Sequence, residues 1–146
     1  MRCRTLGTWT RRLVCNAFAG ILALGSLLAV AEAQTARGGV YSAEQAMRGE
    51  SLYDQQCKEC HGGDLRGFEY GPALAGSEFL RVWGKKSLAD LMEKIQTEMP
   101  ANSPGSLDRS QVADLMAYML RVGKFPAGSG ALGTDAAALK AITIGK

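Results

Sequence analysis

The stretch Cys57-Lys58-Glu59-Cys60-His61 determines how the rest of this sequence is interpreted. It places two thiols three positions apart and an imidazole directly after the second thiol, a compact set of ligand-binding groups. His61 is the single histidine of the 146-residue chain, so imidazole chemistry has only this site. Apolar residues at helical spacing precede the stretch and a glycine-rich segment follows it. We therefore expect the motif at the end of a helix.

Two other cysteines, Cys3 and Cys15, lie in a segment that we expect to be removed. Residues 1–33 run from a basic start through an apolar stretch to Ala31-Glu32-Ala33, the order of a secretory signal peptide with its cleavage site. We therefore predict a signal peptide over 1–33 and a periplasmic protein. The alternative is an uncleaved membrane anchor, because the apolar run is close to the roughly 18–20 residues that a span needs.

After this segment we predict a flexible lead over 34–41 and one folded domain over 42–146, with a small-residue-rich tail from about 124. Of the 17 basic and 14 acidic residues, residues 1–33 contain four arginines and one glutamate, which leaves 13 of each sign. The remaining chain therefore has no formal net charge. We expect no nucleic-acid partner, and no membrane span if the signal is cleaved.

The Cys-x-x-Cys-His pattern is the signature of covalent haem c attachment. The two thiols add to the haem vinyl groups, and the adjacent imidazole becomes an axial iron ligand. We therefore predict one haem c held through Cys57 and Cys60, with His61 as a metal ligand. Export agrees, because haem c is attached outside the cytoplasm.

A Cys-x-x-Cys pair also occurs in redox-active thiol sites and in zinc sites. A thioredoxin-like pair of thiols would lie at a helix N-terminus after a strand, where its pKa is lowered. Here the motif ends a helix and no strand is expected before it. A zinc site would need a fourth ligand. His61 is the single histidine and Cys57 and Cys60 are the only cysteines after residue 33, so zinc is disfavoured.

The sixth iron ligand is sought among the methionines Met47, Met92, Met99, Met116 and Met119. Met92, Met116 and Met119 fall on apolar helix faces, where methionine usually fills a core. Met47 precedes the motif, one turn into a helix. Met99 follows the end of a helix in a proline-bounded loop, whose backbone can aim a thioether. We predict Met99 as a metal ligand, with a core methionine at a helix end as the alternative.

Three segments carry apolar residues at helical spacing behind a capping residue, and they begin at Ser42, Ser87 and Asp108. The second must end before Pro100, which disfavours a helical residue ahead of it. The third is expected to end at Gly123. We therefore predict an all-α domain of three main helices, with short helices and loops around one covalently bound haem.

Shorter elements are expected between and after these helices. Gln45, three residues after Ser42, predicts a capping box at the start of the first helix. A short helix is expected over 77–83. Another is expected to begin at a Thr134 cap and run to Ala141, within the tail that docks on the core.

The sequence resembles the class I cytochromes c over roughly residues 42–145, and this resemblance implies the cytochrome c fold. More narrowly, it is similar to the small periplasmic cytochromes, and cytochrome subunits, that accept electrons from quinoprotein alcohol dehydrogenases. The residues that carry this resemblance are Tyr53, Cys57–His61, Gly62-Gly63-Asp64-Leu65-Arg66-Gly67, Gly71-Pro72-Ala73-Leu74, Phe79, Trp83, Met99-Pro100, Pro104-Gly105-Ser106-Leu107 and Ala117-Tyr118-Met119-Leu120.

The resemblance implies roles for residues around the motif. Pro72 should place its carbonyl on the far ring nitrogen of His61, and Leu74 should pack on the haem face. Trp83 should hydrogen-bond a haem propionate, or alternatively serve as a buried aromatic anchor. Gly49 should permit close approach of the first and last main helices.

Together these observations predict a one-electron carrier rather than an enzyme. Its partners are expected to be redox proteins, with a dehydrogenase as donor and a terminal oxidase or another cytochrome as acceptor. Two alternatives stay open. In the first, the chain is the haem c subunit of a quinoprotein dehydrogenase complex. In the second, it is a ligand-binding, peroxidase-type cytochrome with an open iron site.

Overall fold

The computed structural model describes residues 34–145, and the predicted signal segment lies outside them. The three longest helices described are α2 (Ala43–Gln56), α5 (Leu88–Glu98) and α6 (Arg109–Val122). The shorter elements are β1 (Gln34–Thr35), η1 (Ala36–Gly38), α3 (Lys58–His61), α4 (Gly76–Trp83), α7 (Ala136–Lys140) and β2 (Ile142–Thr143). The fold is mostly helical, as the sequence predicted. None of the helices within 34–145 is long and apolar enough to span a membrane.

Side-chain caps start the second and third long helices where the sequence placed them. Ser87 and Asp90 exchange hydrogen bonds at the start of α5, with their side-chain to backbone distances at 3.2 and 2.9 Å. Asp108 and Gln111 form the same reciprocal pair before α6. Because each pair satisfies two amide groups that the first helical turn leaves free, it sets the start of the helix.

The cap of α2 differs from the expected capping box. Ser42 Oγ accepts from the Gln45 amide at 3.2 Å, as predicted. The Gln45 side chain instead donates to Leu132 O at 3.0 Å and accepts from Leu132 N at 2.7 Å. The amide pairs with backbone 87 residues away because Gln45 is buried under the tail, where both of its polar ends need partners.

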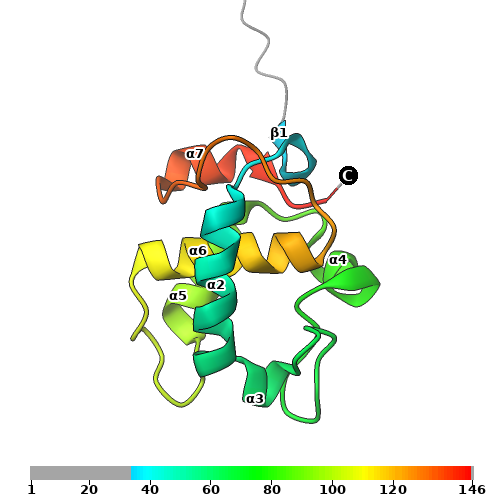
Figure 1. The fold of residues 1–146 in the computed structure, drawn as a ribbon, viewed down its shortest axis with the longest axis vertical. Helices are drawn as coiled ribbons and strands as arrows, with labels where there is room; N and C mark the ends of the chain where they lie inside the picture. Colours follow the sequence, from blue (N-terminus) through cyan, green and yellow to red (C-terminus); the bar gives the residue numbers. More distant parts are fainter. Residues whose placement is uncertain (1–33, 146) are drawn as a thin grey trace, which may run out of the picture. The chain divides into compact units, whose positions relative to one another are not determined.

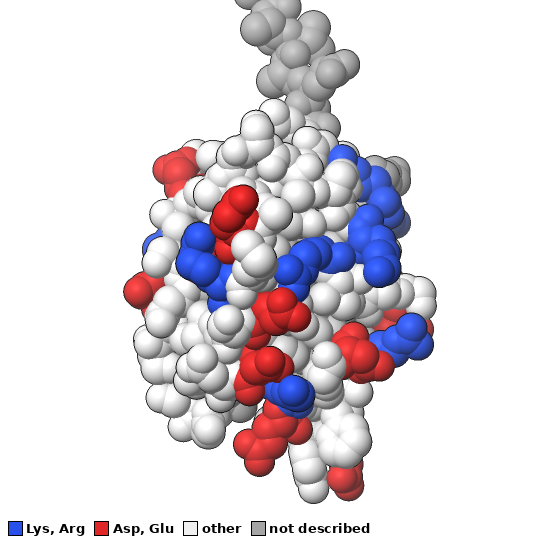
Figure 2. All heavy atoms as spheres, in the orientation of Figure 1, with Lys and Arg blue, Asp and Glu red and all other residues white. Residues whose placement is uncertain are grey.

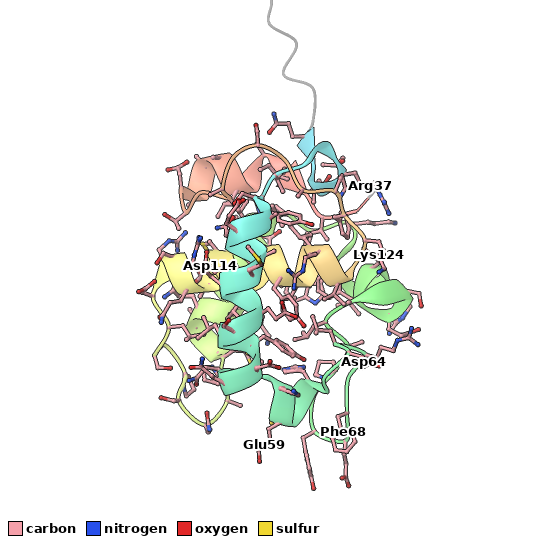
Figure 3. All side chains as sticks on the ribbon, in the orientation of Figure 1. Arg37, Glu59, Asp64, Phe68, Asp114 and Lys124 are labelled. Carbon is pink, nitrogen blue, oxygen red and sulfur yellow. The ribbon has the colours of Figure 1, made fainter. Side chains whose placement is uncertain are left out.

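Helix α2 crosses in front of α6 at a glycine (Figure 1). A Cβ atom built on Gly49 would lie 1.9 Å from the carbonyl oxygen of Asp114, so the two backbones are in direct contact. The Arg48 side chain donates two hydrogen bonds of 2.8 and 2.9 Å to the carboxylate of Asp114, which is labelled in Figure 3. One turn further along α2, the Tyr53 ring packs on Tyr118 with 5.3 Å between centroids. Gly49 therefore permits the close approach predicted.

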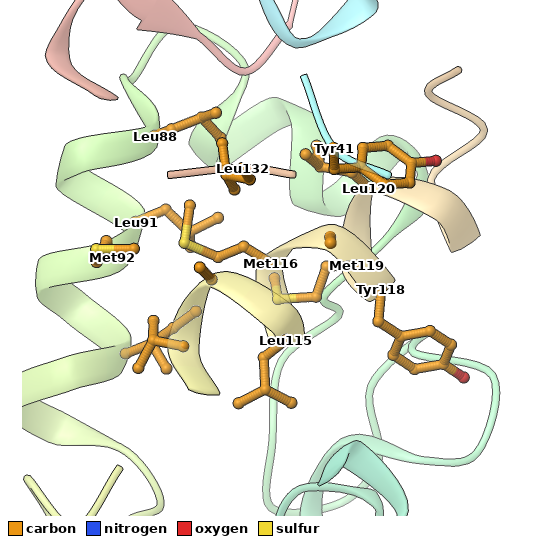
Figure 4. Close-up of a cluster of buried hydrophobic side chains, with 14 of the residues drawn as sticks. Tyr41, Leu88, Leu91, Met92, Leu115, Met116, Tyr118, Met119, Leu120 and Leu132 are labelled. Carbon is orange, nitrogen blue, oxygen red and sulfur yellow. The ribbon is translucent and has the colours of Figure 1, made fainter. Parts of the chain in front are cut away.

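The hydrophobic core lies between α5 and α6, whose apolar faces meet in Figure 4. Met92, Met116 and Met119 are all buried in it, which confirms the prediction that these methionines fill the core. A core of this kind is stabilised by the apolar area removed from water.

The predicted flexible lead is instead part of the folded structure. Strand β1 pairs in parallel with β2, with Gln34 opposite Ile142. Ala36 and Tyr41 are buried, and the Tyr41 hydroxyl donates to Phe125 O at 2.7 Å. The prediction was wrong because it weighed local composition alone, whereas the partners of this segment lie more than 80 residues further along the chain.

The tail docks on the core as expected, with a different cap. Asp135, and not Thr134, caps α7 by accepting from the Ala138 amide at 2.8 Å. Lys140 then donates to Asp90 at 2.7 Å, which ties the tail to the start of α5. This hydrogen bond and the α5 cap lower the pKa of Asp90 to about 2. The Asp90 carboxylate therefore takes part in the cap of α5 and also anchors α7.

Candidate functional site

The Cys-x-x-Cys-His motif begins at the residue that ends α2. Cys57 caps the helix, and its amide donates to Tyr53 O at 2.9 Å. The remaining four residues of the motif form the single turn of α3, which Gly62 ends with a φ of 77°. Cys57 is half-buried and Cys60 is exposed, and both are free thiols. The motif therefore lies at a helix end, as the sequence predicted.

The thiol chemistry of the motif does not suit a disulfide oxidoreductase. Burial, with a smaller contribution from Cys60, raises the pKa of the Cys57 thiol to about 11. A redox-active Cys-x-x-Cys needs the opposite shift, which a helix N-terminus supplies. Within residues 34–145, no group of three or more His, Cys, Asp and Glu side chains could hold a metal ion. The raised pKa of Cys57 favours thioether attachment over the thioredoxin-like alternative.

His61 is held by one hydrogen bond that defines its tautomer. Its ring is 8% exposed, and Nδ1 lies 2.8 Å from the carbonyl oxygen of Pro72. Because a carbonyl can only accept, Nδ1 carries the proton and donates it. Nε2 then has a free lone pair for a metal, the usual arrangement of a ligating histidine and its supporting partner. The structure thus confirms the predicted contact between Pro72 and His61.

The loop that carries Pro72 is built against the motif. The Gly67 amide donates to His61 O at 3.1 Å, so the loop turns back directly after α3. A Cβ atom on Gly71 would lie 2.6 Å from Cys60 O and 2.8 Å from His61 Nδ1. Only glycine fits between the histidine and the residue that fixes it. The sequence predicted Gly71 to lie in a glycine-rich loop and did not reveal its close contact with His61. The Gly71-Pro72 pair is the local signal that pointed to it.

Tyr53 is a second residue whose role emerges only from the structure. Its hydroxyl donates to Gly62 O at 2.6 Å, which ties the turn after His61 back to α2. Burial raises the pKa of Tyr53 far above its usual range, so the hydroxyl keeps its proton and stays a donor at neutral pH. Tyr53 therefore fixes the motif from one side while Pro72 fixes it from the other.

The remaining predicted site residues share one property, which is partial burial at the edge of the core. Leu74, Trp83 and Met99 are each half-buried and packed against the core cluster. Trp83 stacks on Phe79 with 6.3 Å between ring centroids, and Lys86 Nζ lies 4.2 Å from its ring centroid. This packing fits the anchor role weighed for Trp83. Its contact with a propionate, and the packing of Leu74 on haem, stay predictions.

Met99 differs from the other methionines among the described residues. It forms the C-cap of α5 with an extended backbone, φ −123° and ψ 152°, so the chain leaves the helix at this residue. Met92, Met116 and Met119 are buried, and Met47 is exposed on α2. The donor set therefore fits haem c. It consists of two free thiols at the required spacing, an imidazole with a free Nε2, and one half-buried thioether.

These contacts are those of a c-type cytochrome, a class of electron-transfer protein that holds its haem covalently through two cysteines and an axial histidine. The chain belongs to the family described as cytochrome C oxidase, cbb3-type, subunit III, whose model matches residues 44–119. The matched residues run from the first turn of α2 into α6 and include the whole motif. The protein is therefore a haem c electron-transfer domain.

No curated protein matches the chain. Among solved structures, the crystal structure of the sulfane dehydrogenase SoxCD from Paracoccus pantotrophus is similar, with a TM-score of 0.47 and 16% sequence identity. The similarity covers 77% of this chain and 61% of that one, so the chain spans less than two thirds of its relative.

Proposed function

We propose that this chain is a mono-haem, class I cytochrome c of the periplasm. It accepts electrons from a dehydrogenase and passes them, one at a time, to a respiratory acceptor. The observation that carries this function is the 2.8 Å hydrogen bond from His61 Nδ1 to Pro72 O, because it leaves Nε2 free beside two free thiols. A bound haem supplies the one-electron iron couple, and the chain supplies its attachment, its axial ligands and its surroundings.

The residues divide this task by their chemistry. Cys57 and Cys60 hold the haem edge through thioether bonds. His61 would ligate the iron through Nε2, and the Pro72 carbonyl, which accepts from Nδ1, would keep the ring in one orientation and make it a stronger ligand. The half-buried Leu74 is placed to cover apolar surface of the haem.

Met99 is proposed as the sixth ligand. Met92, Met116 and Met119 are buried in the core, and Met47 is exposed on α2. With His61 and Met99 both as ligands, the iron would have a raised reduction potential and no position for an exogenous ligand. Six-coordinate iron suits electron transfer and disfavours the peroxidase-type alternative.

The donor and the assembly state are proposed from the sequence resemblance and the family. The resemblance favours a quinoprotein alcohol dehydrogenase as donor. The description of the family as an oxidase subunit supports a second candidate, in which the chain is a haem c subunit of a larger complex. Purification from the native membrane and soluble fractions separates the two, because a free carrier elutes alone whereas a subunit elutes with a dehydrogenase or an oxidase.

Mass spectrometry of the exported protein tests attachment and processing together. The expected product begins at Gln34 and carries the mass of one haem. A product without haem would refute the proposed function. A product that retains residues 1–33 with haem attached would refute the cleaved signal only.

The ferric absorption spectrum tests the ligand set. A sulfur–iron bond gives a weak near-infrared band, which we expect in the wild type and expect to disappear in Met99→Ala. Met47→Ala is the matched control and should keep the band. High-spin iron in the wild type would contradict ligation by Met99 and favour the ligand-binding alternative.

A further inference from the structure

Two aromatic side chains stand in solvent beside the haem-attachment motif. Phe68 is 64% exposed and Tyr70 is 77% exposed, the highest values among the large hydrophobic side chains exposed over residues 34–145. Phe68 and Gly71 exchange two backbone hydrogen bonds of 2.9 and 3.2 Å, so Glu69 and Tyr70 form the tip of a tight turn. We call residues 68–71 the aromatic turn.

The base of the aromatic turn is fixed on the motif. Gly71 is in contact with the backbone of Cys60 and with the ring of His61, as the distances to its Cβ position show. Gly67, before the turn, donates to His61 O, and Pro72, after the turn, accepts from the His61 ring. Both ends of the turn are therefore anchored to the axial histidine, which gives its exposed side chains a defined position next to the site of electron transfer.

The charges around the aromatic turn are acidic. Residues 54–70 hold four acidic and two basic side chains. Asp54 and Asp64 each pair with one of these bases, at 3.2 and 3.6 Å. Over residues 34–145, Glu59 in the motif and Glu69 at the tip of the turn have no ion-pair partner within 4.0 Å. The aromatic turn and the adjacent motif thus present aromatic surface together with two unpaired carboxylates, Glu69 in the turn and Glu59 in the motif.

Acidic and basic side chains occupy different parts of the visible surface. Figure 2 shows acidic side chains gathered over α2 and α3, whereas basic side chains gather toward the end of the molecule where Arg37 and Lys124 lie. Figure 3 places Phe68 and Glu59 together at the α3 end. Charge is therefore segregated on a described chain whose formal net charge is close to zero, and the acidic end is the one that carries the motif.

Exposed aromatic pairs of this kind need a physical reason. Side chains of phenylalanine and tyrosine are enriched at the centres of protein interfaces, where they supply most of the binding energy. Neither side chain serves the core, because most of each surface is in water. An anionic membrane surface is disfavoured as the occupant because it would repel Glu59 and Glu69.

We propose that the aromatic turn docks a redox partner protein that presents an apolar pocket rimmed by lysine or arginine side chains. Glu59 and Glu69 steer the basic rim toward the motif, and Phe68 and Tyr70 enter the pocket and set the lifetime of the complex. This inference rests on the proposed function, since it names the surface through which the carrier exchanges electrons.

The test uses the haem-loaded protein and a surface of defined chemistry in place of a partner. The probe is a gold electrode coated with mixed methyl-terminated and ammonium-terminated alkanethiols. We expect the wild type to adsorb, measured by quartz crystal microbalance, and to give a direct voltammetric wave. Phe68→Ser with Tyr70→Ser should lower adsorption affinity about tenfold at any salt concentration. Glu59→Gln with Glu69→Gln should lower it at low salt only, because salt screens the charges.

Controls separate this proposal from loss of folding and from loss of the proposed function. Met47→Ser removes an exposed apolar side chain from α2, outside the aromatic turn, and should leave adsorption unchanged. Unchanged adsorption of the aromatic double variant would overturn the proposal. So would a changed haem spectrum in that variant, which would place the aromatics on the haem, or aromatic-dependent binding to neutral phosphatidylcholine vesicles. Absence of haem from the wild type would instead refute the proposed function, and adsorption could still be measured.

Discussion

Replacing Gly49 by alanine tests whether the close crossing of α2 and α6 stabilises the fold. The new Cβ atom would lie 1.9 Å from Asp114 O, 2.5 Å from the carbonyl carbon of Asp114 and 2.9 Å from Tyr118 Cβ. Real Cβ contacts stay above 3.0 Å, so α2 must move about 1.1 Å away from α6 at the least. Two of the three obstacles are backbone atoms of a helix, which cannot rotate aside as a side chain does.

The cost follows from two opposing terms. Overpacking a well-packed contact costs about 1–3 kcal/mol, and a clash with helix backbone lies at the upper end of that range. The better helix propensity of alanine offsets about 1 kcal/mol of it. We expect a net loss of about 2 kcal/mol in the free energy of unfolding, which lowers the Tm by about 8 °C in a domain of this size.

Thermal and urea unfolding of the haem-loaded variant, followed by far-ultraviolet circular dichroism, measure this loss. Gly38→Ala is the matched control, because nothing lies within 4 Å of its Cβ position and its stability should change little. A Gly49→Ala protein that is as stable as the wild type, or more stable by the propensity term, would refute the reasoning. It would mean that the two helices slide apart without losing contacts.

Three further changes test the site and the tail. Gly71→Ala should separate the His61 ring from Pro72 O and lower the haem-to-protein ratio of the purified protein at least tenfold. Gly63→Ala is the control, because its Cβ atom would meet only a lysine carbon at 3.4 Å, and it should keep the wild-type ratio. Equal ratios in the two variants would contradict the close fit at Gly71. Tyr53→Phe should cost about 1–2 kcal/mol of unfolding free energy at pH 7. Because burial raises the pKa of Tyr53 above 10.0, the wild type should also lose stability as pH rises past 10.0, and the variant should lack this contribution. Asp90→Asn should cost about 0.5 kcal/mol at pH 7, after allowance for solvent screening. The pKa of Asp90 in the folded protein is lowered to about 2. The stability difference between the wild type and Asp90→Asn should therefore be full above pH 4 and be lost as pH falls through 2. Urea titrations at each pH measure this difference.

The helices and the motif could be predicted because their signals are local. Ser87 and Asp108 cap helices where the sequence placed them, since a capping side chain reaches only the next turn. The attachment motif is equally local, because two thiols and an imidazole within five residues already have the spacing that haem requires. The contact between Pro72 and His61 was expected from the family resemblance, and the structure shows it.

The failed predictions concern contacts between distant parts of the chain. The Gln45 side chain was predicted to complete the capping box of α2. It instead forms hydrogen bonds with the backbone of Leu132. The lead over 34–41 looked flexible because its local composition is poor in structure-forming signals. Its fold depends on a strand at Ile142–Thr143 and on a carbonyl at Phe125, which no local pattern reveals.

The amino-acid sequence by itself determined that this chain is a helical haem c protein, because covalent attachment and helix capping depend on neighbours within a few residues. Only the tertiary structure decided how His61 is held, why Gly71 has no side chain, and which aromatic residues face solvent beside the motif. These features depend on distances between segments, and such distances arise when the chain folds and buries its apolar faces against one another.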